Sequence, residues 1–345
     1  MDATILLLIV KDGVVNGAVY ALLAIAIVLV FSVTRVIFIP QGEFVAFSAL
    51  TLAALSRGEV AGTAPLLVTL SAISLIGEVI RHRFRLSGRH WARLLARDVA
   101  LPCGLWGATA FLVGFHAGLW VTIPLTLLLM IPIGPVLYRI VFAPLAEASV
   151  LVLLIAAAGV HLTLLGIGLN AFGPEGVRAP GLVSGLQHFG SVTLTSQKTA
   201  LLVVTVALMA ALWFVLQHSM IGKALRAAAV NRIGARLVGL EVAASGQLAF
   251  AIAAAIGTIT GILIGSYTTI YYDTGFLIGL SGFVAAILGG LVSYPATVIA
   301  SLFVGLVEAF SAFEASTYKE VIVFFSIIPV LLVRSLRRRV IEDPE

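Results

Sequence analysis

Three ionisable residues lie inside long apolar stretches of the chain, where burial of a charge costs free energy. Glu43 lies in IPQGEFVAF, Glu308 in GLVEAF and His161 in a VHLTLL run. A charge near the bilayer centre costs about 3 kcal/mol on insertion scales, so such residues usually face a bundle interior or a solute pathway. Glu43 and Glu308 are therefore pathway candidates, and we expect a second polar group beside Glu308. For His161, a proton-relay or ligand role is the alternative to the packed or helix-bonded histidine that we expect.

Helix-breaking residues stand directly before Glu43. Pro40 cannot donate a backbone hydrogen bond, and Gly42 tolerates unusual dihedral angles, so a helix is expected to begin or break here. A carboxylate in the first turn of a helix also interacts favourably with the unpaired N–H groups there. The sequence thus predicts a structural role for Glu43 that does not exclude a role in a substrate pathway.

A second interrupted region, residues 273–295, reads DTGFLIGLSGFVAAILGGLVSYP. Broken segments in the two halves of a chain indicate a midplane substrate site in transporters, and tight helix packing through small residues is the alternative. The pair here would be residues 39–46 and 279–286. The candidate pathway residues are Gln41, Gly42, Glu43, Gly282, Gly289, Gly290 and Glu308.

No catalytic motif accompanies these groups. The sequence lacks a G-x-x-x-x-G-K-[ST] loop for ATP phosphates, since Gly222-Lys223 is followed by alanine and lacks the preceding glycine. H-E-x-x-H and G-x-S-x-G are also missing, the six histidines are dispersed, and Cys103 is the single cysteine. We therefore expect no catalytic residue, no metal site and no cofactor.

The elements that position these residues are expected to lie in a membrane. Of the 345 residues, 61% are hydrophobic and only 11% are charged, whereas a soluble domain carries roughly a quarter charged residues. Apolar runs such as residues 14–33 and 150–169 reach the length of about 20 residues that crosses the hydrocarbon layer as a helix. They are apolar on every face, unlike the alternating strands of a β-barrel. The sequence predicts an all-α, polytopic transmembrane bundle.

We predict nine to eleven membrane segments, some of them discontinuous. Eleven hydrophobic stretches can be delimited: residues 13–33, 38–56, 64–80, 99–117, 119–138, 149–171, 199–217, 243–271, 277–292, 296–313 and 320–335. With the N-terminus outside, sixteen of the 21 Lys and Arg residues fall in cytoplasmic loops, as the positive-inside rule requires. The C-terminus is then cytoplasmic, and the net charge of +5 needs no nucleic-acid partner.

Three loops are distinctive. Residues 82–97 are basic with apolar residues at helical spacing, so they form either an amphipathic segment on the anionic inner leaflet or a plain topology-setting loop. Residues 172–198, with proline and several glycines, predict irregular structure on the outer side. Residues 221–240 are too polar to span. Leu225, Ala229, Ile233 and Leu237 recur there every four residues, which predicts one short amphipathic helix on the cytoplasmic face. It suits either a soluble partner or the membrane surface.

Three stretches, taken together and in order, resemble a known family. The first is NGAVYAL at residues 16–22 with TRVI at 34–37 and QGEF at 41–44; the second is residues 226–240; the third is AILGGL at 286–291, followed by Gly305 and Glu308. They are similar to the permease subunits of branched-chain amino-acid ABC importers. Two features depart from the family pattern: Gln41 stands where members usually carry histidine, and residues 38–40 read Phe-Ile-Pro instead of Asn-Phe-Ala.

The resemblance implies one transmembrane permease domain over residues 1–345 in a bacterial inner membrane. Residues 57–105, which the resemblance does not cover, would be an atypical insertion with a basic cytoplasmic loop. Such a subunit pairs with a second, related permease, two cytoplasmic ATPases and an extracytoplasmic binding protein. Residues 221–240 would be the coupling helix that contacts an ATPase, through Arg226, Asn231, Arg232, Arg236 and Gly239.

Two other function classes compete with this reading. A secondary transporter or channel acting alone would be driven by an ion gradient, and it would need more intramembrane ionisable residues than the three found here. A membrane-embedded enzyme would need converging His, Asp or Glu residues at depth, and the sequence contains no such cluster. An ABC importer permease remains the favoured hypothesis.

Overall fold

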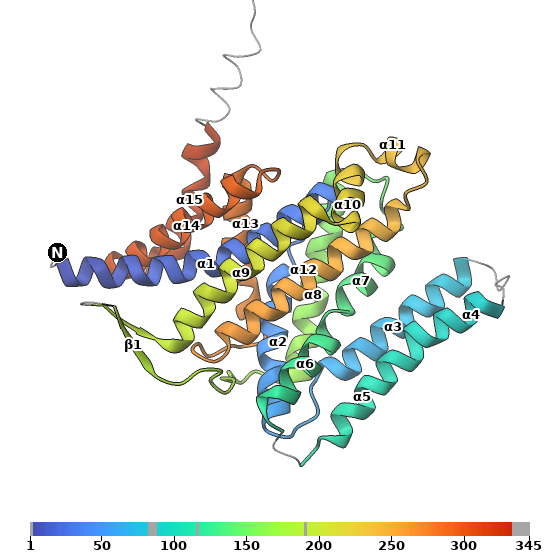
Figure 1. Cartoon of the computed structure of the whole chain (residues 1–345), viewed down its shortest axis with the longest axis horizontal. Helices are drawn as coiled ribbons and strands as arrows, with labels where there is room; N and C mark the ends of the chain where they lie inside the picture. The colour runs from blue at the N-terminus through green and yellow to red at the C-terminus, as the bar shows by residue number, and fades with distance from the viewer. Residues whose placement is uncertain (1–2, 82–87, 115–116, 190–191, 333–345) are drawn as a thin grey trace, which may run out of the picture.

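The computed structural model describes residues 3–81, 88–114, 117–189 and 192–332, and these form a helical bundle (Figure 1). The α-helices are α1 (Ala3–Thr34), α2 (Gln41–Ser56), α3 (Thr63–Arg81), α4 (Gly88–Leu95), α5 (Leu101–Phe111), α6 (Leu119–Met130), α7 (Ile133–Leu137), α8 (Val150–Phe172), α9 (Ser196–His218), α10 (Met220–Val230), α11 (Arg232–Leu237), α12 (Val242–Ile264), α13 (Thr274–Gly289), α14 (Tyr294–Glu314) and α15 (Lys319–Phe325). Two π-helical turns, η1 (Ala96–Ala100) and η2 (Tyr138–Phe142), and a 3-10 turn, η3 (Ser316–Tyr318), extend them.

Seven helices of the described residues are long and apolar enough to cross a membrane. They are α1, α3, the continuous series α6–α7–η2, α8, α9, α12 and α14. The other four predicted segments correspond to shorter helices: α2, η1 with α5, α13 and α15. The predicted polytopic bundle with discontinuous members is thus confirmed, and α2 and α13 are its short apolar helices of 16 residues each.

The long helix α1 is the centre of the bundle. It packs against α12, α13 and α14, and its stretch from Val15 to Val30 is almost entirely buried. Small residues set the α1–α14 contact, because a Cβ added at Gly305 would lie 2.3 Å from the backbone nitrogen of Gly17. Such small-residue stripes let two transmembrane helices approach closely.

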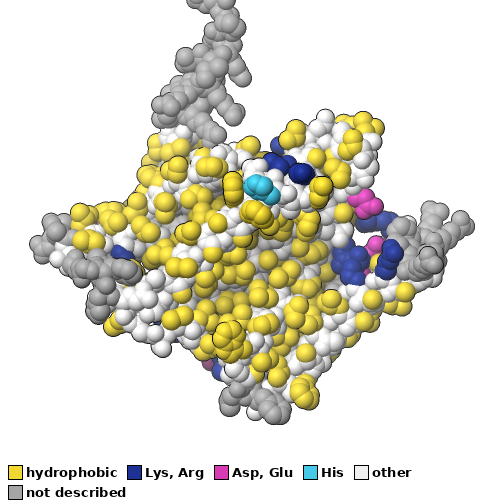
Figure 2. All heavy atoms as spheres, viewed as in Figure 1, with side chains coloured by type: hydrophobic (Ala, Val, Ile, Leu, Met, Phe, Trp, Pro, Cys, Tyr) yellow, Lys and Arg dark blue, Asp and Glu magenta, His cyan; other side chains and the backbone are white. Residues whose placement is uncertain are grey.

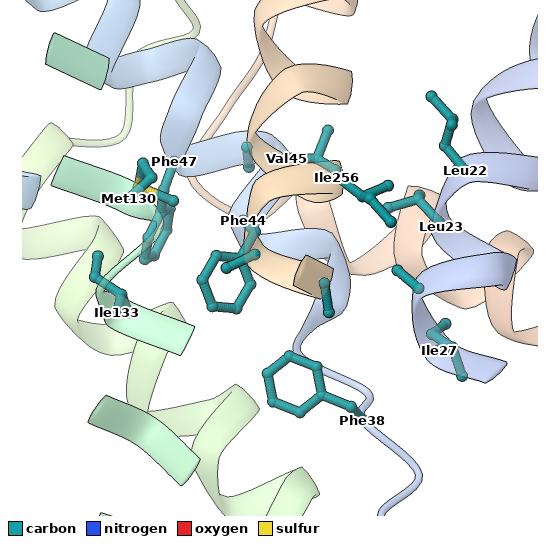
Figure 3. Close-up of a cluster of buried hydrophobic side chains, with 14 of the residues drawn as sticks. Leu22, Leu23, Ile27, Phe38, Phe44, Val45, Phe47, Met130, Ile133 and Ile256 are labelled. Carbon is teal, nitrogen blue, oxygen red and sulfur yellow. The ribbon is translucent and has the colours of Figure 1, made fainter. Parts of the chain in front are cut away.

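Helix α2 is surrounded by protein on every side. Residues 41–55 are all buried, which fits a segment that carries apolar residues on every face and few polar ones. Figure 3 shows Phe47 beside Met130, and Phe38 and Phe44 near the centre of the same cluster. On the other side of this cluster, Leu23 of α1 points toward Ile256 of α12, and Leu22 and Ile27 lie on the same stretch of α1 (Figure 3). The apolar core therefore holds α2 between α12 and the α6–α7 series.

Two segments project from this body. Helices α3 and α5 lie side by side as a hairpin at one edge of the molecule (Figure 1). On another edge, strands β1 (Leu186–Phe189) and β2 (Val192–Thr195) form an antiparallel hairpin, with Leu186 paired to Thr195. The expectation of wholly irregular structure over residues 172–198 was therefore wrong for this part, where the Val-Thr-Leu-Thr sequence has high strand propensity.

Candidate functional site

The first turns of α2 and α13 are in direct backbone contact. A Cβ added at Gly42 would lie 1.8 Å from the carbonyl oxygen of Gly275 and 2.9 Å from Cα of Gly279. Only glycine permits this approach, because any side chain at residue 42 would overlap the α13 backbone. The structure thus brings together the two interrupted regions that the sequence predicts to be paired.

Both short helices begin near the middle of longer ones. Gln41 donates from Nε2 to the carbonyl oxygen of Ala253, 2.9 Å away at the midpoint of α12. Thr274, the first residue of α13, lines a cavity with Asn16 and Tyr20, near the midpoint of α1. From this point α2 continues along α12 toward Gly265, whereas α13 continues along α1 and α14 toward Thr297. The two helices are therefore half-length elements that start together and diverge.

Glu43 pairs across this junction with His161, at the midpoint of α8. Oε1 of Glu43 is bonded to Nδ1 of His161, and both residues are buried. One face of the imidazole ring stacks on Phe276 of α13, with ring centroids 4.5 Å apart. A buried carboxylate is tolerated when such a partner offsets its charge. Helices α2, α8 and α13 thus share one polar contact at mid-length.

This contact changes two expectations. The carboxylate caps no N–H group of its own first turn, because Oε1 bonds His161 and Oε2 has no hydrogen-bond partner in the described part of the chain. His161 in turn is bound to an acid of another helix and is more than a packed or helix-bonded histidine. Little space adjoins the pair: the cavity beside Glu43 and Phe47 measures about 10 Å³. The junction is closed in this structure.

A second polar contact within the bundle involves Glu308. Tyr20 of α1 donates its hydroxyl to Oε2 of Glu308 on α14, which confirms the expected polar company for this acid. The pair lines a cavity of about 250 Å³ between α1, α13, α14 and α15. Ser281 and Lys319 also line it, so the cavity presents acidic, basic and hydroxyl groups together. A cavity of this size and polarity can hold a small zwitterion.

The remaining glycine candidates lie apart from both polar groups. Gly282 packs against Leu23 of α1, where an added Cβ would lie 2.8 Å from the leucine Cβ. Gly289 packs against the backbone of Thr297. Gly290 ends α13 with a positive φ of 88°, a conformation that favours glycine and turns the chain into α14. These three residues thus shape the packing of α13 in this structure.

The 221–240 stretch folds as two helices and not as one. Asn231 leaves the helical region with φ −148°, and its Oδ1 accepts a 2.9 Å hydrogen bond from the backbone N–H of Gly234. Asn231 therefore ends α10 and caps α11. The predicted apolar face over Leu225, Ile233 and Leu237 does not hold, because Leu225 is buried whereas the other two are 73% and 83% exposed.

The basic candidates of this stretch have different partners. Arg232 donates from Nη2 to the carbonyl oxygen of Val33, 2.9 Å away at the end of α1, and from Nη1 to that of Ala146 at 3.2 Å. Burial lowers the pKa of the Arg232 guanidinium below its ordinary value. Arg226 binds Gln217, and Arg236 lies 3.5 Å from Glu147 at the surface. Gly239, with φ 84°, forms the turn after α11.

An apolar patch is exposed on α10 and α11. It consists of Val230, Ile233, Leu237 and Val238, each more than 70% exposed. Exposed apolar residues that gather on one short segment mark an interaction site more often than scattered ones do. We call this set the α10–α11 patch. It includes none of the five candidates that the sequence suggested for contact with an ATPase.

Tyr20 and Phe276 were not among the sequence candidates, and His161 was noted there but expected to be a packed or helix-bonded histidine. A histidine in an apolar helix is itself a signal, because intramembrane ionisable residues usually have a partner. Nothing in the sequence identified which acid it would meet. Tyr20 lies in the NGAVYAL stretch, and only its contact with α14 reveals its role.

Comparisons with known proteins find one matching family and several similar proteins. The family described as branched-chain amino acid transport system / permease component matches residues 9–332. The high-affinity branched-chain amino acid transport system permease protein LivH of Escherichia coli K12 is 34% identical over 202 residues, which are 56% of this chain and 66% of the relative. BraD of Pseudomonas aeruginosa, of the same description, is 32% identical over 203 residues, 57% of this chain and 66% of the relative. Each match thus spans just under two thirds of the relative. No solved structure matches.

Proposed function

Because the chain belongs to the family of permease components of branched-chain amino acid transport systems, we propose that it is the membrane-spanning subunit of an ABC importer. It moves branched-chain or related amino acids into the cell, and partner ATPases drive the movement. The chain performs no ATP chemistry and is not an enzyme, in keeping with its lack of a P-loop.

The junction of α2 and α13 is the observation that carries this proposal. In transporters, discontinuous helices place their N-terminal ends at the bilayer midplane, where the partial positive charge favours an anionic group of the substrate. Here the N-terminal turns around Gly42 and Gly275 touch at mid-length of the longer helices. The substrate carboxylate passes this junction, and the surrounding apolar side chains suit an aliphatic substrate. Gln41, Gly42, Glu43 and Gly282 belong to the pathway, with Gly289 and Gly290 positioning α13.

The partners follow from the same assignment. A second, related permease completes the pathway, a binding protein delivers substrate from outside, and two ATPases dock at the cytoplasmic face. The chain would lie in the inner membrane of a bacterial cell, and the basic ends of its segments favour a cytoplasmic C-terminus. Residues 57–105, which include α3, α4 and the first part of α5, are an addition to the usual permease. Residues 82–87 of their basic loop lie outside the described residues.

Reconstitution tests the function as a whole. Proteoliposomes that contain this chain with the permease and ATPases encoded beside it should take up radiolabelled leucine only when ATP and the binding protein are both supplied. A chain that alone transports leucine down an imposed ion gradient would instead be a secondary transporter, and the ABC assignment would fail.

Glu308→Gln is expected to lower the uptake rate at least tenfold. The substitution keeps the shape of the side chain but removes the charge that can hold an ammonium group, and a hydrogen bond to a charged group is worth about 1.5–3 kcal/mol. Uptake in proteoliposomes measures the effect. Glu314→Gln, at the exposed end of the same helix, is the matched control and should transport normally. Equal rates for both variants would remove Glu308 from the pathway.

Leu237→Glu is expected to abolish co-purification with the ATPase. The leucine is 83% exposed on the α10–α11 patch, so a charge there leaves the fold intact but prevents an apolar partner from closing over it. Affinity pull-down of the tagged ATPase measures binding. Val183→Glu changes an exposed apolar residue in the loop before β1 and should leave binding unchanged. If the ATPase is retained by the Leu237 variant, the patch is not the docking surface.

A further inference from the structure

A cavity of about 310 Å³ lies between the C-terminal end of α3 and the body of the bundle. Its polar lining comes from Ser74, Glu78 and Arg81 of α3, Arg139 of η2 and Gln247 of α12. Gly77 also lines it, and an added Cβ there would meet nothing within 4 Å. The cavity is thus a genuine recess that a substitution can fill, at the end of α3 where the sequence predicts the cytoplasmic boundary.

The charges around this recess leave a positive excess. Asp98 is buried and binds both Arg97, at 2.7 Å, and Arg139, at 3.0 Å. Arg97 also binds Glu78 at 2.7 Å. The two acids are therefore occupied by Arg97 and Arg139, and Arg81 makes no ion pair with any described residue.

Donors without acceptors lie at the wall of the same recess. Within the described part of the chain, Nε and Nη1 of Arg139 and Oγ of Ser74 have no hydrogen-bond partner. These three atoms are closed to solvent, so they make the wall of the recess polar but do not themselves reach an occupant. Arg81, which makes no ion pair with any described residue, is the cation that can contact a phosphate oxygen in the recess.

The surface beside the recess is apolar. Ile73, Ile76 and Ile80 are 52%, 58% and 65% exposed along α3. Figure 2 shows basic and acidic side chains gathered in a notch at one edge of a face that is otherwise mainly hydrophobic. A molecule that fills the recess and also covers this face of α3 would combine an anionic group with an apolar part.

We propose that this recess binds the phosphate headgroup of an anionic phospholipid, whose acyl chains lie against Ile73, Ile76 and Ile80. Basic pockets between transmembrane helices at a membrane boundary bind such headgroups. A protein partner is disfavoured because the charged groups lie inside a recess, beside a helix face suited to lipid. The lipid would fasten the α3–α5 hairpin to η2 and α12, and this role does not depend on the transported substrate.

Native mass spectrometry of the full chain in neutral detergent tests the proposal, with phosphatidylglycerol as the probe and phosphatidylcholine as the neutral reference. Wild type should retain one phosphatidylglycerol in preference to phosphatidylcholine. Arg81→Gln should weaken phosphatidylglycerol binding about fivefold, the contribution of one basic side chain near an anionic surface. Gly77→Leu, which fills the recess and keeps every charge, should weaken it at least as much.

Two matched controls separate the recess from general surface charge. Arg93→Gln removes an exposed arginine of α4 that does not line the recess, and Gly104→Leu fills open space on α5; both should bind phosphatidylglycerol as wild type does. Equal weakening by Arg93→Gln and Arg81→Gln would overturn the proposal. So would displacement of the lipid by equimolar inorganic phosphate, which would assign the recess to a soluble anion. Loss of ATPase binding by Gly77→Leu with lipid binding unchanged would assign it to a protein.

Discussion

Gly42→Ala is expected to destabilise the bundle by roughly 3 kcal/mol, the upper range for overpacking a tightly packed interior. The new methyl group would lie 1.8 Å from the carbonyl oxygen of Gly275, and that oxygen belongs to helix backbone that cannot rotate aside. To remove this overlap, the first turns of α2 and α13 must move apart. The junction would then lose the geometry that holds Glu43 against His161.

Thermal unfolding of the purified full chain in detergent, followed by fluorescence of its four tryptophans, measures this effect. Gly104→Ala is the control, because an added Cβ at Gly104 meets nothing within 4 Å and alanine favours the helix by about 0.5–1 kcal/mol. The two variants should therefore shift the melting temperature in opposite directions. If Gly42→Ala melts with wild type, the close contact between α2 and α13 is wrong.

His161→Leu is expected to destabilise the protein by about 3 kcal/mol or more, the range for breaking a buried ion pair by removal of one partner. It leaves Glu43, 2% exposed, with no partner for either oxygen. Glu43→Leu should cost less, because the histidine left behind can give up its proton and become neutral. The double variant Glu43→Leu/His161→Leu should recover most of the lost stability, since leucines can replace a buried pair without an unpaired charge.

Uptake of leucine by the same three variants separates a structural from a functional role. If the pair belongs to the pathway, the double variant should remain inactive although it is stable, because the polar group at mid-length is gone. A double variant that is stable and transports at the wild-type rate would show that the pair only holds α2 and α8 together. A double variant no more stable than His161→Leu would refute the pairing itself.

The sequence predicted the paired interruptions, and the reason is local. Proline and glycine act on their own backbone, so a break at Pro40–Gly42 and glycines near Gly279 can be located without knowledge of the fold. The helices themselves follow from apolar runs of sufficient length, and seven of them reach spanning length in the described residues. These features depend on neighbours along the chain.

The polar contacts could not be predicted because they depend on distant residues. Glu43 and His161 are 118 positions apart, and Tyr20 and Glu308 are 288 apart. Helices that are apolar on every face offer no periodicity to show which side meets which neighbour. The break at Asn231 is different: an asparagine followed three residues later by Gly234 can form an N-terminal cap, and the four-residue apolar repeat concealed it.

Arg232 connects α11, which carries part of the proposed ATPase docking surface, to two helices that reach the middle of the bundle. Its guanidinium donates to the carbonyl oxygen of Val33 near the end of α1 and to that of Ala146 in the segment before α8, and α8 carries His161. A displacement of α11 would either break these two hydrogen bonds or move the ends of α1 and α8 with it. We therefore expect Arg232 to be the residue that couples the position of α11 to α1 and α8.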